Sequence, residues 1–279
     1  MTGFTLLALL ASVCLGASDF LGGTLTRRVP LLTVLVLSQL VATLVTLPRL
    51  LFAEPGGDLG PALLWGAVGG LAVAAGVSSL YEALATGTMG VVAPVAALSV
   101  LVPASAGILG GDPIGPLLAV GMVVAVGGTV LATGPELRGR GGGARPILLA
   151  LLSALGFGIS NLTVAWGSAA HVGATLLGNS VTALLAYCVV ALVRRHRPRA
   201  GGWPLAGIAA IGVLGFAANL CFALASRSGL LSVVAVFASL FPAVTALLGW
   251  WFHAERLSPV QLAGVALVFT GVGVIAAST

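Results

Sequence analysis

The chain contains the same sequence pattern twice. Residues 6–20 (LLALLASVCLGASDF) align without a gap on residues 148–162 (LLALLSALGFGISNL), and the alignment places Asp19 on Asn161. Internal repetition constrains the fold more than any local pattern does, because each copy must form the same structural unit. A fold for this chain therefore has to contain two related halves.

A second pair of segments extends the repeat. Residues 83–104 match residues 223–243 with one gap, and Pro103 falls on Pro242. Five apolar segments fit into each half of the chain. An odd number of membrane crossings inverts the second copy relative to the first, which is a construction typical of secondary transporters.

Composition excludes a water-soluble fold. Hydrophobic residues make up 59% of the chain and charged residues 7%, whereas about a quarter of the residues in soluble domains are charged. An apolar run of about 18 residues or more can cross a bilayer. We predict ten such spans, near residues 3–25, 31–52, 61–86, 88–109, 114–134, 145–166, 171–193, 203–226, 229–252 and 258–277.

These patterns predict an all-α integral membrane protein. Its ten transmembrane helices are expected to form two inverted five-helix repeats around a central cavity. The first repeat is predicted at residues 1–134 and the second at residues 145–279. A Gly/Arg-rich linker at residues 135–144 would join them, because that stretch is too short and too polar to be a span.

The basic residues indicate the orientation. Net charge is +5, and the twelve basic residues, all arginine, sit singly or in short clusters rather than on a dense basic face, so no nucleic-acid partner is predicted. Ten of them fall in connections on one side of the predicted membrane: Arg27, Arg28, Arg138, Arg140, Arg145, Arg194, Arg195, Arg197, Arg199 and Arg256. Only Arg49 and Arg227 fall on the other side. Since positive charge near span ends favours the cytoplasm, both termini are predicted to be extracytoplasmic.

No motif indicates catalysis or metal binding. The chain has no HExxH, G-x-S-x-G or P-loop motif, and Cys14, Cys188 and Cys221 lie in separate spans without C-x-x-C spacing. We interpret the three cysteines as small core residues. The sequence therefore predicts neither an enzyme nor a bound metal or cofactor.

The second half resembles a known family. The stretch FALASRSGLLSVVAVFASLFPAVTALLGWWFHAERLSPVQLAGVALVFTGVGVI (residues 222–275) is similar to the second repeat of EamA-type proteins in the drug/metabolite transporter superfamily. The first half resembles the same family through LGASDFLGG, YEALATG and VVAPVAALSVLVPA. The resemblance implies a ten-helix plasma-membrane protein of two inverted repeats around a cavity, which moves small metabolites or amino acids, often outward.

Two acidic residues, Asp19 and Glu82, lie well within predicted spans. An ionised carboxylate at the middle of a membrane costs at least about 2.5–3.5 kcal/mol, and such groups usually face a cavity or a partner. Glu82 follows Tyr81 and aligns with Phe222, so it has no acidic counterpart in the repeat. We interpret the two acids as a pair that carries protons or binds a substrate amine. Glu82 is the first candidate for proton coupling because it is the asymmetric acid, and Asp19→Asn, which introduces the residue found at position 161, should have a milder effect than Glu82→Gln. The alternative is that they are hydrated structural groups near the lipid headgroups.

Amides and hydroxyls form a second layer of candidates. They either line the cavity and bind polar substrate atoms or join helices to one another, and the sequence leaves both interpretations open. These candidates are Gln39 with its repeat counterpart Asn179, Asn161, Asn219, Ser18 and Ser160. Together with the two acids, the four amide residues are expected to face one shared, water-accessible cavity. The spans at 114–134 and 258–277 should be peripheral.

Three prolines are candidates for gating. Pro94 and Pro103 interrupt the span predicted at 88–109, and Pro242 interrupts the span at 229–252. A proline inside a membrane helix frees carbonyl groups that a cavity or a neighbouring helix must satisfy. Either the helices bend there during gating or the prolines hold static kinks.

The leading functional hypothesis is a secondary transporter. It would carry a small-molecule substrate by alternating access, with proton antiport and facilitated diffusion both compatible with the residues present. The alternative is a non-transporting membrane scaffold or sensor, which would need no polar cavity.

The distribution of arginines generates a test of orientation. With both termini outside, a C-terminal fusion to a reporter that is active only in the cytoplasm should be silent, and one that is active only outside should be active. The opposite pattern would show that the arginine-rich side does not face the cytoplasm.

Overall fold

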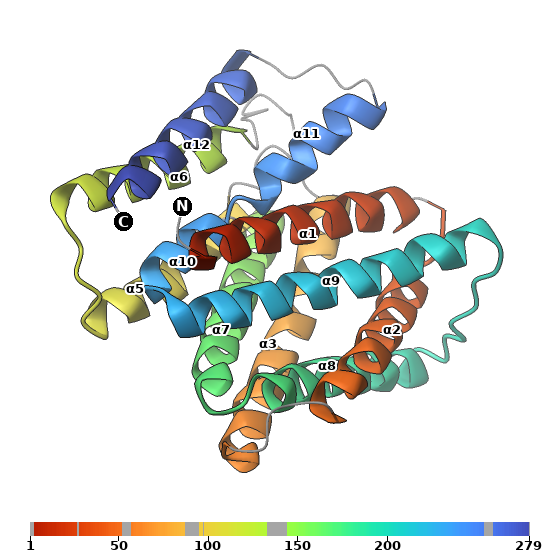
Figure 1. The fold of residues 1–279 in the computed structure, drawn as a ribbon. Helices are drawn as coiled ribbons and strands as arrows, with labels where there is room; N and C mark the ends of the chain where they lie inside the picture. The colour runs from red at the N-terminus through yellow and green to blue at the C-terminus, as the bar shows by residue number, and fades with distance from the viewer. Residues whose placement is uncertain are drawn as a thin grey trace.

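The structure, a computed structural model, describes residues 3–26, 28–51, 57–86, 95–96, 98–132, 144–253 and 259–278. Helices account for all of the regular secondary structure in these ranges (Figure 1). The elements are α1 (Gly3–Thr26), α2 (Leu31–Leu51), α3 (Leu59–Thr86), the 3₁₀ helix η1 (Leu98–Val100), α5 (Leu101–Leu109), α6 (Pro116–Ala132), α7 (Ala144–Ala170), α8 (Val172–Val193), α9 (Trp203–Ser228), α10 (Leu231–Ala238), α11 (Phe241–His253) and α12 (Pro259–Ser278).

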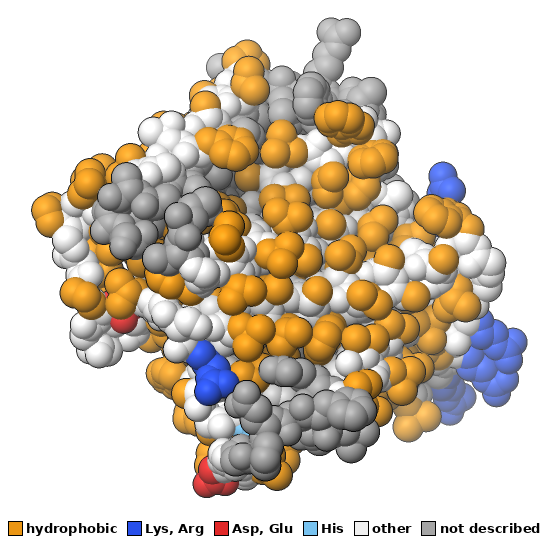
Figure 2. Space-filling model, viewed as in Figure 1, with side chains coloured by type: hydrophobic (Ala, Val, Ile, Leu, Met, Phe, Trp, Pro, Cys, Tyr) orange, Lys and Arg blue, Asp and Glu red, His pale blue; other side chains and the backbone are white. Residues whose placement is uncertain are grey.

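Six of these helices, α1, α2, α3, α7, α8 and α9, are long and apolar enough to cross a membrane. Their outer surfaces carry large apolar side chains, such as Leu64 at 66% and Leu192 at 78% exposure. Figure 2 shows apolar side chains spread over the visible face, with basic groups at its margins. A surface of this kind suits contact with lipid. The prediction of an all-helical chain with membrane-length spans is confirmed.

The first three long helices pack against the last three. The third helix of the first half, α3, lies against α7 and α8, while α9 lies against α1 and α2. α2 also lies against α8. α6 and α12 pack against each other at one side of the molecule (Figure 1). Each half is therefore held mainly by helices of the other half.

Small residues bring α3 and α7 close together. A Cβ atom added at Gly156 would lie 2.6 Å from the carbonyl oxygen of Ala72 and 2.7 Å from the Cα atom of Gly76. On the neighbouring side of α3, a Cβ at Gly70 would collide with the carbonyl oxygen of Asn179 in α8. Glycine is the residue that fits these contacts, because any side chain would force the helices apart.

The span predicted at 229–252 consists of two helices. α10 ends at Ala238, and α11 begins at Phe241. The Ser239 N–H donates to the carbonyl oxygens of Ala235 and Val236, which closes the end of α10. Pro242, the second residue of α11, has no N–H with which to continue the helical hydrogen bonds across the break. The break therefore lies next to the proline at which the sequence predicts an interruption.

The equivalent region of the first half is also irregular. η1 precedes α5, and Pro103 lies in the first turn of α5, as Pro242 lies in the first turn of α11. Pro94 and the rest of residues 87–94 lie outside the described residues, as do residues 133–143, which contain most of the linker predicted at 135–144.

One connection ties the two halves together. Asp112, between α5 and α6, accepts hydrogen bonds through Oδ2 from the backbone N–H (2.9 Å) and the hydroxyl group (2.7 Å) of Ser232. Ser232 lies in the first turn of α10. The carboxylate of Asp112 thus caps a helix of the other half, and a charged acceptor makes these hydrogen bonds strong.

The α3–α7 contact predicts opposite effects for two glycine substitutions. Gly156→Ala should destabilise the protein by about 1–3 kcal/mol, because the added methyl group overpacks the contact. Gly127→Ala in α6 meets no atom within 4 Å and should be neutral or favourable by up to about 1 kcal/mol, because alanine is the better helix residue. Thermal unfolding in detergent would measure both. Equal midpoints for the two variants would contradict the proposed tight contact.

Candidate functional site

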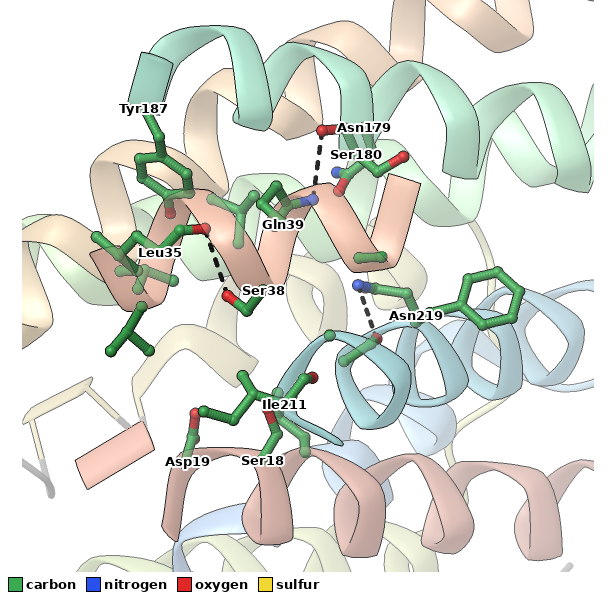
Figure 3. Close-up of a pocket in the computed structure, with 18 of the residues that line it drawn as sticks. Ser18, Asp19, Leu35, Ser38, Gln39, Asn179, Ser180, Tyr187, Ile211 and Asn219 are labelled. Atoms are coloured by element: carbon green, nitrogen blue, oxygen red, sulfur yellow. Dashed lines mark hydrogen bonds between the residues drawn. The ribbon is translucent and has the colours of Figure 1, made fainter. Parts of the chain in front are cut away.

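A cavity of about 130 Å³ lies between helices of both halves (Figure 3). It has room for several water molecules or part of a small ligand. α1, α2, α3, α7, α8 and α9 all contribute to its lining. Its polar lining residues are Ser18, Asp19, Ser38, Gln39, Thr46, Asn179, Ser180, Tyr187 and Asn219. We refer to it below as the first cavity.

Asp19 supplies the charge in this lining. No arginine, histidine or second acid occurs among the described residues that line the first cavity. None of the hydrogen bonds or ion pairs found among the described residues involves the Asp19 carboxyl group. Its neighbour Ser18, in contrast, has a partner within the protein: the Ser18 hydroxyl donates to the carbonyl oxygen of Ile211 in α9 at 3.3 Å. Asp19 is therefore placed to interact with water, a proton or a ligand in the cavity.

The three amide side chains each make one hydrogen bond to the protein. Gln39 Nε2 donates to the Ser180 carbonyl oxygen at 3.3 Å, and Asn219 Nδ2 donates to the carbonyl oxygen of Gly215, one turn earlier in α9, at 3.2 Å. Within the described ranges, their side-chain oxygens accept no hydrogen bond. These oxygens remain available to donors in the cavity, so the lining is rich in acceptors.

Asn179 connects this cavity to α7. Its Nδ2 atom donates to the hydroxyl oxygen of Ser160 at 3.2 Å, and both side chains are buried. Gln39 and Asn179 are repeat counterparts, and both bond across to another helix. Asn179 therefore joins α8 to α7 through a hydrogen bond, and it also lines the first cavity.

A second, smaller cavity of about 70 Å³ lies beside the first. It contains Asn161, the repeat counterpart of Asp19, together with the buried Ser160. The irregular segments of both halves reach it through Ser99 of η1 and Ser239 at the break between α10 and α11. The structure therefore places Asn161 in the second cavity and not in the first, where the sequence analysis expects it.

Glu82 lies in neither of these cavities. Its side chain is 47% exposed, and its carboxylate forms an ion pair with Arg145, with Oε1 and Nη2 2.5 Å apart. The expectation that Glu82 shares a cavity with Asp19 is wrong. The physical reason is its position near the C-terminal end of α3, next to the start of α7, where both charged groups reach the surface. The side chain of Tyr81 lies outside the described part of the structure.

Several lining residues escaped the sequence analysis. Tyr187 is 4% exposed and lies in α8, where its hydroxyl is a polar group inside a span. Ser38 precedes Gln39 and Ser180 follows Asn179 in the sequence. Because both amides are predicted to line the cavity, their serine neighbours could have been predicted as well. Pro103 is buried in α5 but lines neither cavity. Bending at the prolines stays a prediction.

Comparisons with known proteins agree with the arrangement. Residues 144–277 match the family model described as the EamA-like transporter family. No curated protein matches the chain. A solved structure titled "Crystal structure of protein" is 18% identical, with a TM-score of 0.78, over 97% of this chain and 95% of that one. At that identity the likeness shows that the fold is shared.

The different surroundings of the two acids predict different effects on stability. Asp19→Asn should leave the thermal midpoint unchanged or raise it, because the change removes a charge inside the membrane span and breaks no contact. Glu82→Gln should cost less than about 1 kcal/mol, as expected for an exposed ion pair. Thermal unfolding in detergent measures both. A large loss of stability in Asp19→Asn would mean that the carboxylate has a structural partner.

Proposed function

Because its second half, residues 144–277, belongs to the EamA-like transporter family, we propose that this multi-pass membrane protein is a secondary transporter. It carries a small molecule across the plasma membrane by alternating access, in the export direction. Members of this family are transporters rather than enzymes. The observation that carries the proposal is the first cavity, which both halves build and which holds an acid without a partner among the described residues.

The inverted repeat is part of the proposal. In the proposed topology, the six long helices and four shorter or interrupted apolar segments cross the membrane ten times. The contacts support this symmetry, since α3 lies on α7 and α8 of the second half while α9 lies on α1 and α2 of the first. Helices that pack across halves in equivalent pairs allow one half to rock against the other around a site between them.

Two glycines repeat the same contact in each half. A Cβ at Gly16 would meet the carbonyl oxygen of Phe241 at 2.6 Å, and a Cβ at Gly158 would meet that of Ser99 at 2.8 Å. Gly16 and Gly158 are repeat counterparts. In each case the first helix of one half rests on the interrupted helix of the other half. This repeated contact supports the two-fold relation.

We assign proton coupling to Asp19. In the proposed cycle, a proton from the extracytoplasmic side binds this carboxylate while the substrate leaves, and the proton is released inside when the next substrate binds. A carboxylate that has no cation or donor among the described residues is suited to this exchange, because its charge is compensated by what enters the cavity. The substrate is a small metabolite or amino acid whose donor groups meet the acceptor-rich lining.

Transport by purified protein in proteoliposomes tests the proposal. A metabolite that raises the thermal midpoint serves as the substrate, and its movement is followed with and without an imposed pH gradient. Asp19→Asn should bind the metabolite but lose the dependence on the gradient. Glu82→Gln is the matched control, because it neutralises an acid outside the cavity, and it should keep that dependence.

Two outcomes would contradict these assignments. If Asp19→Asn retained wild-type dependence on the gradient, Asp19 would not carry the coupling. If no metabolite that binds were transported under any gradient, the protein would be a non-transporting scaffold or sensor.

A further inference from the structure

The two cavities share part of their walls. Leu15, Val73, Phe157 and Asn219 line both of them, so the two cavities meet at these four side chains. Three of the four are apolar. The first cavity holds Asp19, and the second holds Asn161. The lining that holds Asp19 therefore meets the lining that holds Asn161 at mostly apolar side chains.

Two of the shared residues are equivalent under the sequence repeat. The alignment that pairs Asp19 with Asn161 also pairs Leu15 with Phe157. Each lies in the first helix of its half, directly before a glycine that packs against the interrupted helix of the other half. Leu15 and Phe157 therefore lie where the two halves meet. A movement of one half relative to the other would change the separation of these two side chains.

We propose that the second cavity is a separate chamber of the transport route, closed from the first by the Leu15–Phe157 pair. This inference rests on the proposed function. Phe157 supplies most of the barrier, because its ring is the larger of the two side chains. When the halves rock, the pair separates and the substrate passes between the chambers.

The lining of the second chamber indicates what it accepts. Ser99, Ser160 and Ser239 are buried hydroxyls, and no charged residue occurs among the described residues lining this cavity. Within the described ranges, the Asn161 amide makes no hydrogen bond. The chamber therefore offers hydrogen bonds but no counter-charge, which suits the neutral polar part of a substrate.

Thiol accessibility tests the barrier without relying on transport. Cys14, Cys188 and Cys221 are first replaced by alanine in the full-length protein. Ser38→Cys then reports on the first cavity, and Ser239→Cys reports on the second. In proteoliposomes, a small membrane-impermeant thiol reagent is added on the side from which Ser38→Cys reacts, and the rate of modification is measured by mass spectrometry.

Ser239→Cys should react slowly in this background. Adding Phe157→Ala should raise its rate at least about tenfold, equivalent to a barrier lower by about 1.4 kcal/mol. Phe157→Leu, which copies the residue at position 15, should give a smaller increase and serves if the alanine variant does not fold. Phe216→Ala is the matched control, since Phe216 lines the first cavity and not the second, and it should leave Ser239→Cys slow.

Two results would overturn the inference. If Ser239→Cys reacted as fast as Ser38→Cys while Phe157 was intact, the two cavities would be one space. If neither substitution at Phe157 raised the rate, this side chain would not be the barrier. A protein that shows the expected pattern but transports nothing would refute the proposed function instead, so the two failures are distinguishable.

Discussion

The close packing of α3 against α7 and α8 is the contact on which the rest of the structure depends. Lipid is as apolar as the side chains, so burial against a neighbouring helix gains little from the hydrophobic effect, and helices associate through van der Waals contact and hydrogen bonds. Such contact needs backbones that approach closely, as at Gly76 and Gly156. Since these helices come from different halves, the packing that stabilises the protein also encloses the space between the halves.

That enclosed space explains how polar residues persist inside a bilayer-spanning bundle. A buried amide without a hydrogen bond is costly in hydrocarbon, and Gln39, Asn179 and Asn219 each donate to a neighbouring group while leaving an oxygen toward the first cavity. Gln39 and Asn179 therefore join two helices each, whereas the hydrogen bond of Asn219 stays within α9. Of the two interpretations that the sequence left open, the structure shows the helix-joining one for Gln39 and Asn179, and substrate binding stays a prediction.

Sequence alone predicted the helical class, the long spans and five of the nine polar residues around the first cavity. It succeeded there because the repeat aligns Asp19 with Asn161 and Gln39 with Asn179, so that polar groups recur at equivalent depths in two apolar spans. It failed for Glu82, because hydropathy does not reveal where a helix reaches the surface beside an arginine. It also missed the second cavity and the place of Leu15 and Phe157 in the walls of both cavities, because apolar residues at an interior wall look like any other core residues in sequence.

The ties between the halves differ in their chemistry. Glu82 and Arg145 form an ion pair that is open to water, whereas Asp112 holds the fully buried Ser232 through two hydrogen bonds. In the proposed topology these ties lie on opposite faces of the membrane. Dissolved salt screens exposed charges far more than buried ones. Higher ionic strength on the arginine-rich face therefore weakens the Glu82–Arg145 ion pair more than the hydrogen bonds between Asp112 and Ser232. In the proposed transport cycle, the balance between inward-open and outward-open forms would then depend on the electrolyte on one side of the membrane.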